Sequence, residues 1–215
     1  QICTWLIVYT KRQERFPRKG SCLLHRKGEK QMQPLELYIH IPFCVKKCAY
    51  CDFLSGPAGE KEKEEYVKML VDEIRNCPDT VQNYRVISIF FGGGTPSLLT
   101  GEQIGRLMDT VREIFTLDED AEITMEMNPG TVTEEKLRKY RQAGVNRLSI
   151  GLQSVNDEEL RLLGRIHTYE EFREAYHLAR ANGFSNINVD LISAIPGQTV
   201  ESWRRTLEQL SLKNM

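Results

Sequence analysis

The sequence lacks any long apolar stretch, and it lacks a strong overall charge. No apolar run approaches the roughly 20 residues that a helix needs to cross a bilayer, so the sequence predicts no integral membrane segment. The formal net charge is −1, and bulk electrostatics therefore favour neither nucleic acid nor a membrane surface as a partner. Of the 215 residues, 40% are hydrophobic and 27% are charged, which is ordinary for one globular domain with a full core.

Evenly spaced cysteines, the mark of a disulfide-stapled secreted domain, are also lacking. Such domains are shorter and spread their cysteines along the chain. Here one group of three falls within eight residues and the other three are scattered: Cys44, Cys48 and Cys51, then Cys3, Cys22 and Cys77. Clustered cysteines of this kind more often bind metal. They also favour a reducing compartment, and we expect the protein to be cytoplasmic.

Charge is distributed unevenly along the chain. Residues 1–33 carry eight Lys and Arg against two Asp and Glu, whereas the remainder is acidic. A composition break of this size marks a boundary, which divides the chain into a basic leader over 1–33 and a core domain over 34–215. The leader has no sustained periodicity. It partly fits a mitochondrial transit peptide, but we favour a leader that is either disordered or wrongly included in the sequence and that contributes nothing to the fold.

From residue 35 onward, short apolar strands alternate with amphipathic helices. Three helix starts carry capping signals at Thr100, Asn156 and Thr168. The predicted strands cover residues 35–41, 85–91, 122–127, 147–152 and 188–192. Predicted helices include 62–76, 133–143 and 201–210.

This alternation predicts an α/β fold with a parallel sheet of right-handed βαβ units. The apolar strands indicate a sheet buried on both faces. Five units are visible, and spacing alone allows either an open doubly wound sheet or an incomplete barrel. In both folds, polar residues at the carboxyl ends of the strands mark the working face.

A compact cysteine motif follows the first predicted strand. The C-x3-C-x2-C spacing from Cys44 to Cys51 lets three thiolates of one loop converge on one iron–sulfur cluster. Three cysteines cannot saturate four irons, so the fourth iron stays open for a substrate or cofactor. The alternatives are a Cys3His zinc site with His40 as the fourth ligand and three unrelated thiols. The density of the three cysteines favours the cluster.

Further candidate residues stand at the ends of the later strands. Gly92–Gly94 closes the second strand, where glycines let the backbone approach a ligand and expose N–H groups; a simple glycine-rich turn is the alternative. Glu126, Gln153 and Asp190 lie in or just after the next three strands, with Arg165 between the last two. Singly, each suits an ordinary surface or cap. Together they place a polar group at successive strands, where a parallel barrel builds its site.

The segment from Tyr38-Ile-His-Ile-Pro-Phe-Cys44 to Cys51-Asp-Phe53 resembles the radical S-adenosylmethionine (SAM) superfamily. It is most similar to the branch that contains oxygen-independent coproporphyrinogen III oxidase and the HemW-type haem chaperones. The resemblance covers residues 35–215. It implies a partial (β/α) radical SAM barrel with about five of six βα units, the sixth unit and a C-terminal domain being expected beyond Met215. It also implies a [4Fe–4S] cluster and SAM as cofactors.

The resemblance further implies a role for each site residue. Cys44, Cys48 and Cys51 match the metal ligands of the cluster. Positions that hold the cluster-bound SAM are matched by Tyr38, Gly93 and Glu126. Those that hold a second SAM in the oxidase are matched by Tyr50, Gly94, Thr95, Gln153, Arg165 and Asp190. The implied chemistry is an electron from the cluster that cleaves SAM to methionine and a 5′-deoxyadenosyl radical, with the barrel supplying position and shielding.

One departure from the oxidase pattern bears on function. The oxidase has a further cysteine two residues after the third ligand, where this chain has Phe53. That ending resembles the HemW-type chaperones, which bind haem and pass it to client proteins. The implied partners are SAM, haem, an electron donor and a haem-receiving client protein; the alternative is radical decarboxylation of a porphyrinogen in porphyrin biosynthesis. No catalytic residue is assigned, and for His167 and His177 we expect structural or solvent-exposed roles rather than haem ligation.

The clustered thiols generate the first test. Anaerobic reconstitution should yield about four irons and four sulfides per chain, because three cysteines with one open iron suit a [4Fe–4S] cluster. Alanine at Cys44, Cys48 or Cys51 should abolish the brown chromophore, whereas Cys77→Ala serves as the control and should retain it. Stoichiometric zinc in the purified protein, or loss of the cluster in Cys77→Ala, would contradict the assignment.

Overall fold

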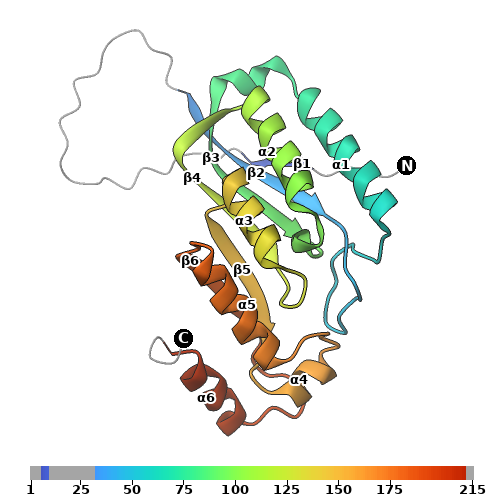
Figure 1. The fold of residues 1–215 in the computed structure, drawn as a ribbon, viewed down its shortest axis with the longest axis vertical. Helices are drawn as coiled ribbons and strands as arrows, with labels where there is room; N and C mark the ends of the chain where they lie inside the picture. The colour runs from blue at the N-terminus through green and yellow to red at the C-terminus, as the bar shows by residue number, and fades with distance from the viewer. Residues whose placement is uncertain (1–5, 10–31, 212–215) are drawn as a thin grey trace, which may run out of the picture.

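The computed structural model describes residues 6–9 and 32–211 of the chain (Figure 1). The strands are β1 (Leu6–Tyr9), β2 (Gln33–Ile41), β3 (Tyr84–Gly93), β4 (Thr116–Met127), β5 (Arg147–Gln153) and β6 (Asn186–Leu191). The helices are α1 (Glu60–Arg75), α2 (Gly101–Ile114), α3 (Glu134–Ala143), α4 (Asp157–Leu162), α5 (Tyr169–Ala181) and α6 (Val200–Gln209), with 3-10 turns η1 (Asp79–Asn83) and η2 (Pro96–Leu98). In the described part of the chain, no helix is long and apolar enough to span a bilayer.

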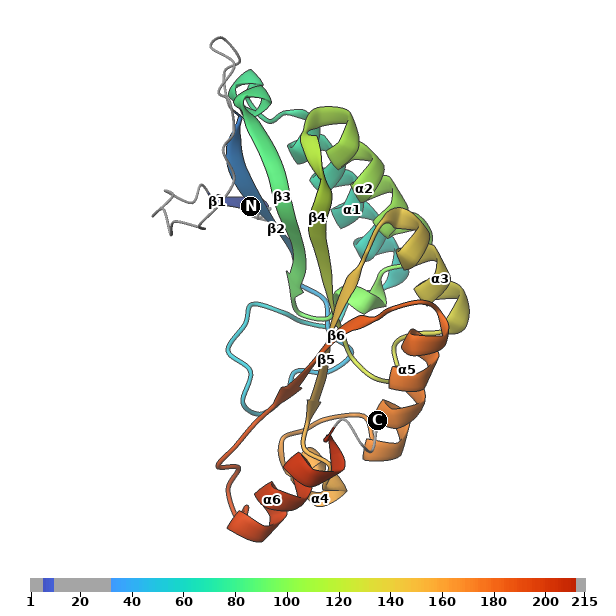
Figure 2. The same cartoon turned by 90° about the vertical axis from the view of Figure 1, so that its left-hand side faces the viewer.

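The strands form one sheet in the order β1-β2-β3-β4-β5-β6, in which β2 to β6 run parallel. This confirms the α/β fold with five parallel strands. Figure 2 shows α1, α2, α3 and α5 together on one face of the sheet, with the loop after β2 on the other. Helices on a single face distinguish the arrangement from a doubly wound sheet. The sheet is not closed, as expected of an incomplete barrel.

The two faces of the sheet differ in polarity. In β2, Leu35, Leu37 and Ile39 are buried toward the helices, while the residues between them are half-buried on the other face. That second face carries polar side chains, among them Glu126 and Ser149. The prediction of a sheet buried on both faces is therefore wrong for β2 and β6, where the second face is half-buried, whereas Thr124 and Ser149 are buried on that face of β4 and β5. Along β4 and β5, polar side chains alternate with apolar ones and point to this second face. They line the inner wall of the partial barrel, while the helices cover the opposite face.

The predicted helix starts are confirmed at all three caps. Thr100 and Thr168 each accept a hydrogen bond from the backbone N–H three residues on and form capping boxes with Gln103 and Glu171. Asn156 accepts from the Glu158 N–H and opens the short α4. These caps satisfy backbone donors that a helix start leaves unpaired.

The N-terminal segment differs in part from the sequence-based expectation. Leu6–Tyr9 forms β1, which pairs antiparallel with β2 in a register that places Leu6 opposite Ile39. A hydrogen-bonded edge strand in this segment was not expected. The remainder of the 1–33 leader, over 1–5 and 10–31, lies outside the described residues.

Helix α3 fixes the turn that follows β3. The fully buried Tyr140 hydroxyl donates to the carbonyl oxygens of Leu99, at 2.6 Å, and Ser97, at 3.2 Å. Lys136 Nζ donates to the Ser97 carbonyl at 2.9 Å and to that of Thr131 at 3.1 Å. These bonds hold η2, and with it the glycine run just before η2, against the third βα unit.

Removing the Tyr140 hydroxyl should therefore destabilise the fold. Tyr140→Phe keeps the ring but removes the hydroxyl that donates to the Leu99 carbonyl, and we expect the free energy of unfolding to fall by about 1–2 kcal/mol. Denaturant titration would measure it. Tyr176→Phe on α5 is the control: its ring packs on Phe172, and its loss should be smaller. Equal losses in the two variants would show that the Tyr140 bonds do not anchor the turn.

Candidate functional site

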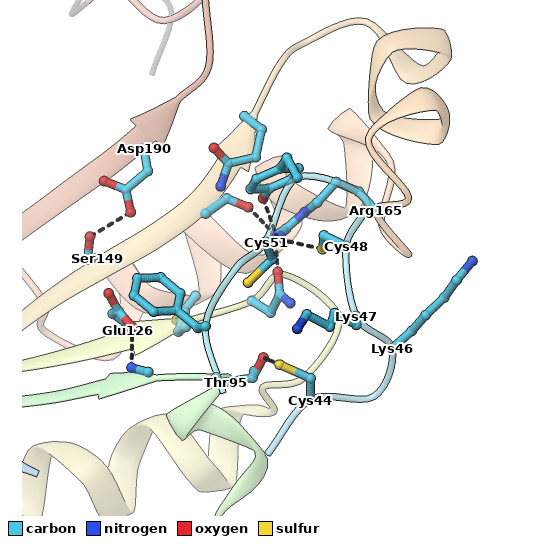
Figure 3. Close-up of a pocket in the computed structure, with 18 residues that line it drawn as sticks. Cys44, Lys46, Lys47, Cys48, Cys51, Thr95, Glu126, Ser149, Arg165 and Asp190 are labelled. Atoms are coloured by element: carbon cyan, nitrogen blue, oxygen red, sulfur yellow. Dashed lines mark hydrogen bonds between the residues drawn. The ribbon is translucent and has the colours of Figure 1, made fainter. Parts of the chain in front are cut away.

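A pocket lies at the carboxyl ends of the parallel strands, where β3, β4, β5 and β6 meet the loop that joins β2 to α1 (Figure 3). We call this loop, residues 42–59, the cysteine loop. The pocket has a volume of about 200 Å³. Its position agrees with the working face expected for a parallel barrel.

The cysteine loop is held by backbone hydrogen bonds to the glycine run. Gly94 N–H donates to the Ile41 carbonyl at 2.8 Å, and Thr95 N–H donates to the Phe43 carbonyl at 2.6 Å. A Cβ on Gly94 would lie 2.5 Å from the Phe43 oxygen, which no side chain allows. Glycine is thus required here for close backbone approach.

All three clustered thiols line this pocket. Cys44, Cys48 and Cys51 are free and partly exposed. The Thr95 hydroxyl donates to Cys44 Sγ at 3.6 Å, and the Arg165 guanidinium donates to Cys48 Sγ at 3.8 Å. Two of the three sulfurs thus have a polar hydrogen-bond donor beside them.

The three thiols are the kind of ligand that holds an iron–sulfur cluster. In the described residues, no three His, Cys, Asp or Glu side chains are grouped closely enough to hold one metal ion. His40 does not complete a zinc site, because its ring lies beside the Tyr38 hydroxyl and the Leu54 carbonyl, each at 3.4 Å. A cubane cluster takes each cysteine on a separate iron, so its ligands need not meet at one point.

Glu126 stands at the end of β4 and faces the pocket. One carboxylate oxygen accepts the Gly93 N–H at 3.1 Å. Burial raises the pKa of the Glu126 carboxyl; the Gly93 hydrogen bond opposes the rise, and the nearby Asp190 carboxylate adds to it. Gly93 has φ +112°, and a Cβ there would lie 2.4 Å from the His40 ring, so this contact also depends on glycine.

A network of side-chain hydrogen bonds links β5 and β6 beside the pocket. The Ser149 hydroxyl on β5 donates to Asp190 on β6 at 2.9 Å. Asn188 Nδ2 donates to the Ser149 hydroxyl at 3.1 Å and to Asp190 at 2.7 Å. These bonds hold the Asp190 carboxylate at the inner wall, where Figure 3 shows it beside Ser149.

The pocket brings together eleven of the twelve predicted site residues. The exception is Tyr38, which lies on β2 with its ring stacked on Phe90 and does not line the pocket. The sequence analysis missed six further lining residues: Lys46, Lys47, Met127, Asn128, Ser149 and Gly151. A signal existed for two of them, because Ser149 and Gly151 precede Gln153 at the two-residue period of one strand face. The binding roles of all these residues stay predictions.

Neither histidine after β5 lines the pocket. His167 is buried, and burial lowers its pKa to about 4, with the Arg165 charge adding to the shift. His177 is exposed on α5 with its ring against Tyr176. Both placements agree with structural or solvent-exposed roles.

Comparison with known proteins gives consistent matches. The profile of the radical SAM superfamily matches residues 38–210. The chain is 47% identical over 180 residues to the haem chaperone HemW of Escherichia coli strain K12, covering 83% of this chain and 48% of that protein. It is 38% identical over 183 residues to the oxygen-independent coproporphyrinogen III oxidase of Salmonella typhimurium, covering 85% and 40%.

A solved structure is similar as well. Coproporphyrinogen III oxidase (HemN) from Escherichia coli, described as a radical SAM enzyme, superposes with a TM-score of 0.77 at 36% identity. The match covers 85% of this chain and 42% of that one. The chain thus spans about half the length of the relatives that it matches.

The raised pKa of Glu126 predicts that removing its charge stabilises the fold in a pH-dependent way. The folded state disfavours the ionised carboxylate, so the stability that goes with the protonated form is fully present below the unfolded pKa, about 4.3. It is lost as pH rises through the folded pKa. Glu126→Gln keeps an acceptor for Gly93 without the charge. In the cluster-free chain it should raise the thermal midpoint at pH 7.5 by roughly 1–3 °C, with the difference shrinking near pH 4.

Glu122→Gln on the same strand is the control. Glu122 is exposed and pairs with Arg147 at 3.5 Å, so its loss should bring no gain at pH 7.5. A thermal midpoint that falls in Glu126→Gln at that pH would show that the ionised Glu126 stabilises the fold.

Proposed function

Because the chain belongs to the radical SAM superfamily, we propose that its pocket holds a [4Fe–4S] cluster with SAM on the open iron, and that the natural protein acts in haem trafficking. The observation that carries the first part is the convergence of three free thiols, a glycine run and Glu126 on one pocket. The second part rests on the similarity to HemW and on Phe53 in place of a further cysteine.

Within this proposal the chain's own residues have distinct tasks. Cys44, Cys48 and Cys51 hold the cluster, which when bound supplies the electron for reductive cleavage of SAM. Glu126, held by the Gly93 N–H, offers an acceptor to the polar end of SAM. Asp190 on β6 offers a second acceptor on the same inner wall of the pocket.

The surface of the cysteine loop suits haem. Phe53 is 60% exposed beside the pocket and Leu54 is 76% exposed, which is unusual for large apolar side chains close together. Lys46 and Lys47 are exposed on the same loop, and Figure 3 shows Lys46 pointing away from the pocket. Haem is a flat apolar ligand with carboxylate groups, and this loop offers both apolar side chains and cations to such a ligand.

The second candidate is oxygen-independent oxidation of a coproporphyrinogen. The similarity to the HemN structure favours it, since the two folds superpose well over this chain. It requires a radical delivered to a propionate side chain with matched geometry. Phe53 speaks against it, because the oxidase pattern has cysteine at this position.

The two functions give opposite results with the natural full-length protein, reconstituted without oxygen. We expect haem binding in an absorbance titration and no conversion of coproporphyrinogen III with SAM and a reductant. Phe53→Ala should weaken haem binding by up to about tenfold, the order expected for losing one apolar contact. Val200→Ala, at an equally exposed apolar residue on α6 (69%), should not weaken it.

Formation of protoporphyrinogen IX by the wild-type protein would overturn the haem-trafficking proposal in favour of the oxidase. Unchanged haem binding in Phe53→Ala would show that Phe53 of the cysteine loop does not contribute to the haem site.

A further inference from the structure

Arg165 occupies an unusual place between the cysteine loop and the sheet. It lies in the turn between α4 and α5, and its guanidinium reaches the pocket (Figure 3). Nη1 donates to Cys48 Sγ at 3.8 Å and to the Tyr50 hydroxyl at 3.4 Å. Nη2 donates to the Gly151 carbonyl and to the Asn128 side-chain oxygen. One side chain thus connects the cysteine loop with the ends of β4 and β5.

These contacts use the available donors of the guanidinium. Arginine carries four N–H bonds on its two Nη atoms and one on Nε. The four Nη contacts account for the first four. The Arg165 Nε is buried and has no hydrogen-bond partner among the described residues. The Nη donors of Arg165 are therefore used within the protein, where they connect the cysteine loop with the sheet.

The backbone around Arg165 is shaped to permit this placement. Ala49 N–H donates to the Leu163 carbonyl at 3.0 Å, which docks the cysteine loop on the same turn. Gly164 has φ +75°, and a Cβ there would lie 3.3 Å from the Ala49 nitrogen. A Cβ on Gly151 would lie 3.2 Å from Arg165 Nη2. Two glycines thus leave room for the loop and for the guanidinium.

We propose that Arg165 is a positioning residue that clamps the cysteine loop to the sheet and donates a hydrogen bond to the sulfur of Cys48 that ligates the cluster. The second half rests on the proposed function, because it needs the cluster. A cationic N–H donor at a ligand sulfur favours the more negative, reduced form of an iron–sulfur cluster. Arg165 accordingly raises the reduction potential.

The clamp is tested in the cluster-free chain by limited trypsin digestion. Lys46 and Lys47 lie in the clamped loop, and cleavage after them reports its opening. Arg165→Gln should accelerate this cleavage by about tenfold, as expected for losing hydrogen bonds from a charged donor. Arg161→Gln, at an exposed arginine on α4, should cleave at the wild-type rate. A wild-type rate in Arg165→Gln would overturn the clamp.

The hydrogen bond to sulfur is tested by the midpoint potential of the reconstituted protein. Arg165→Gln should give a lower potential than wild type, and Arg165→Lys, which keeps the charge, should recover part of the difference. An unchanged potential in Arg165→Gln would overturn the donor role. If wild type assembles no [4Fe–4S] cluster, the proposed function and this half of the inference fail together, while the digestion still decides the clamp.

Gly151→Ala provides a second test of the clamp in case the arginine variants do not fold. Its added Cβ would press on Arg165 Nη2 and on the Gln153 amide, 2.9 Å away, and displace the guanidinium without removing its charge. Faster cleavage of the loop, smaller than in Arg165→Gln, is expected. Cleavage at the wild-type rate would show that the contact with β5 does not hold the loop.

Discussion

The close approach of two backbone segments determines where the thiols lie. Gly94 and Thr95 donate to the carbonyls at the start of the cysteine loop, and only a residue without a side chain fits opposite Phe43. Since both segments follow parallel neighbouring strands, the sheet itself brings them together. This contact between the first two parallel strands holds the start of the cysteine loop, and with it Cys44, at the pocket.

The fold could be predicted where the local pattern decides the structure. Capping residues such as Thr100 and Thr168 act within one turn of helix, and the five parallel strands follow from their apolar composition. The burial of the sheet could not be predicted in this way. Whether Thr124 or Ser149 faces a helix or an open wall depends on which side the helices take, and that is a property of the whole sheet. The pairing of Leu6–Tyr9 with β2 likewise depends on a tertiary contact rather than on the four residues themselves.

The site shows the same division between local and distant information. The cysteine spacing and the glycine run are local signals, and both lead to the pocket. Glu126, Gln153 and Asp190 could be placed because parallel strands end at one edge. Asn128 and Gly151 were missed because their importance comes from Arg165, which contacts them across the fold. Conversely, Tyr38 was placed by resemblance, and its stacking on Phe90 keeps it along the wall of β2 rather than in the pocket.

The contact between Cys48 and Arg165 joins residues 117 positions apart, which has a consequence for biosynthesis. During synthesis on the ribosome, all three clustered cysteines emerge early, while the second support of their loop emerges only after four βα units. A nascent chain therefore presents its thiols for an interval on a loop that still lacks its contacts with Leu163 and Arg165. The cysteine loop gains this second support only once the chain has passed Arg165.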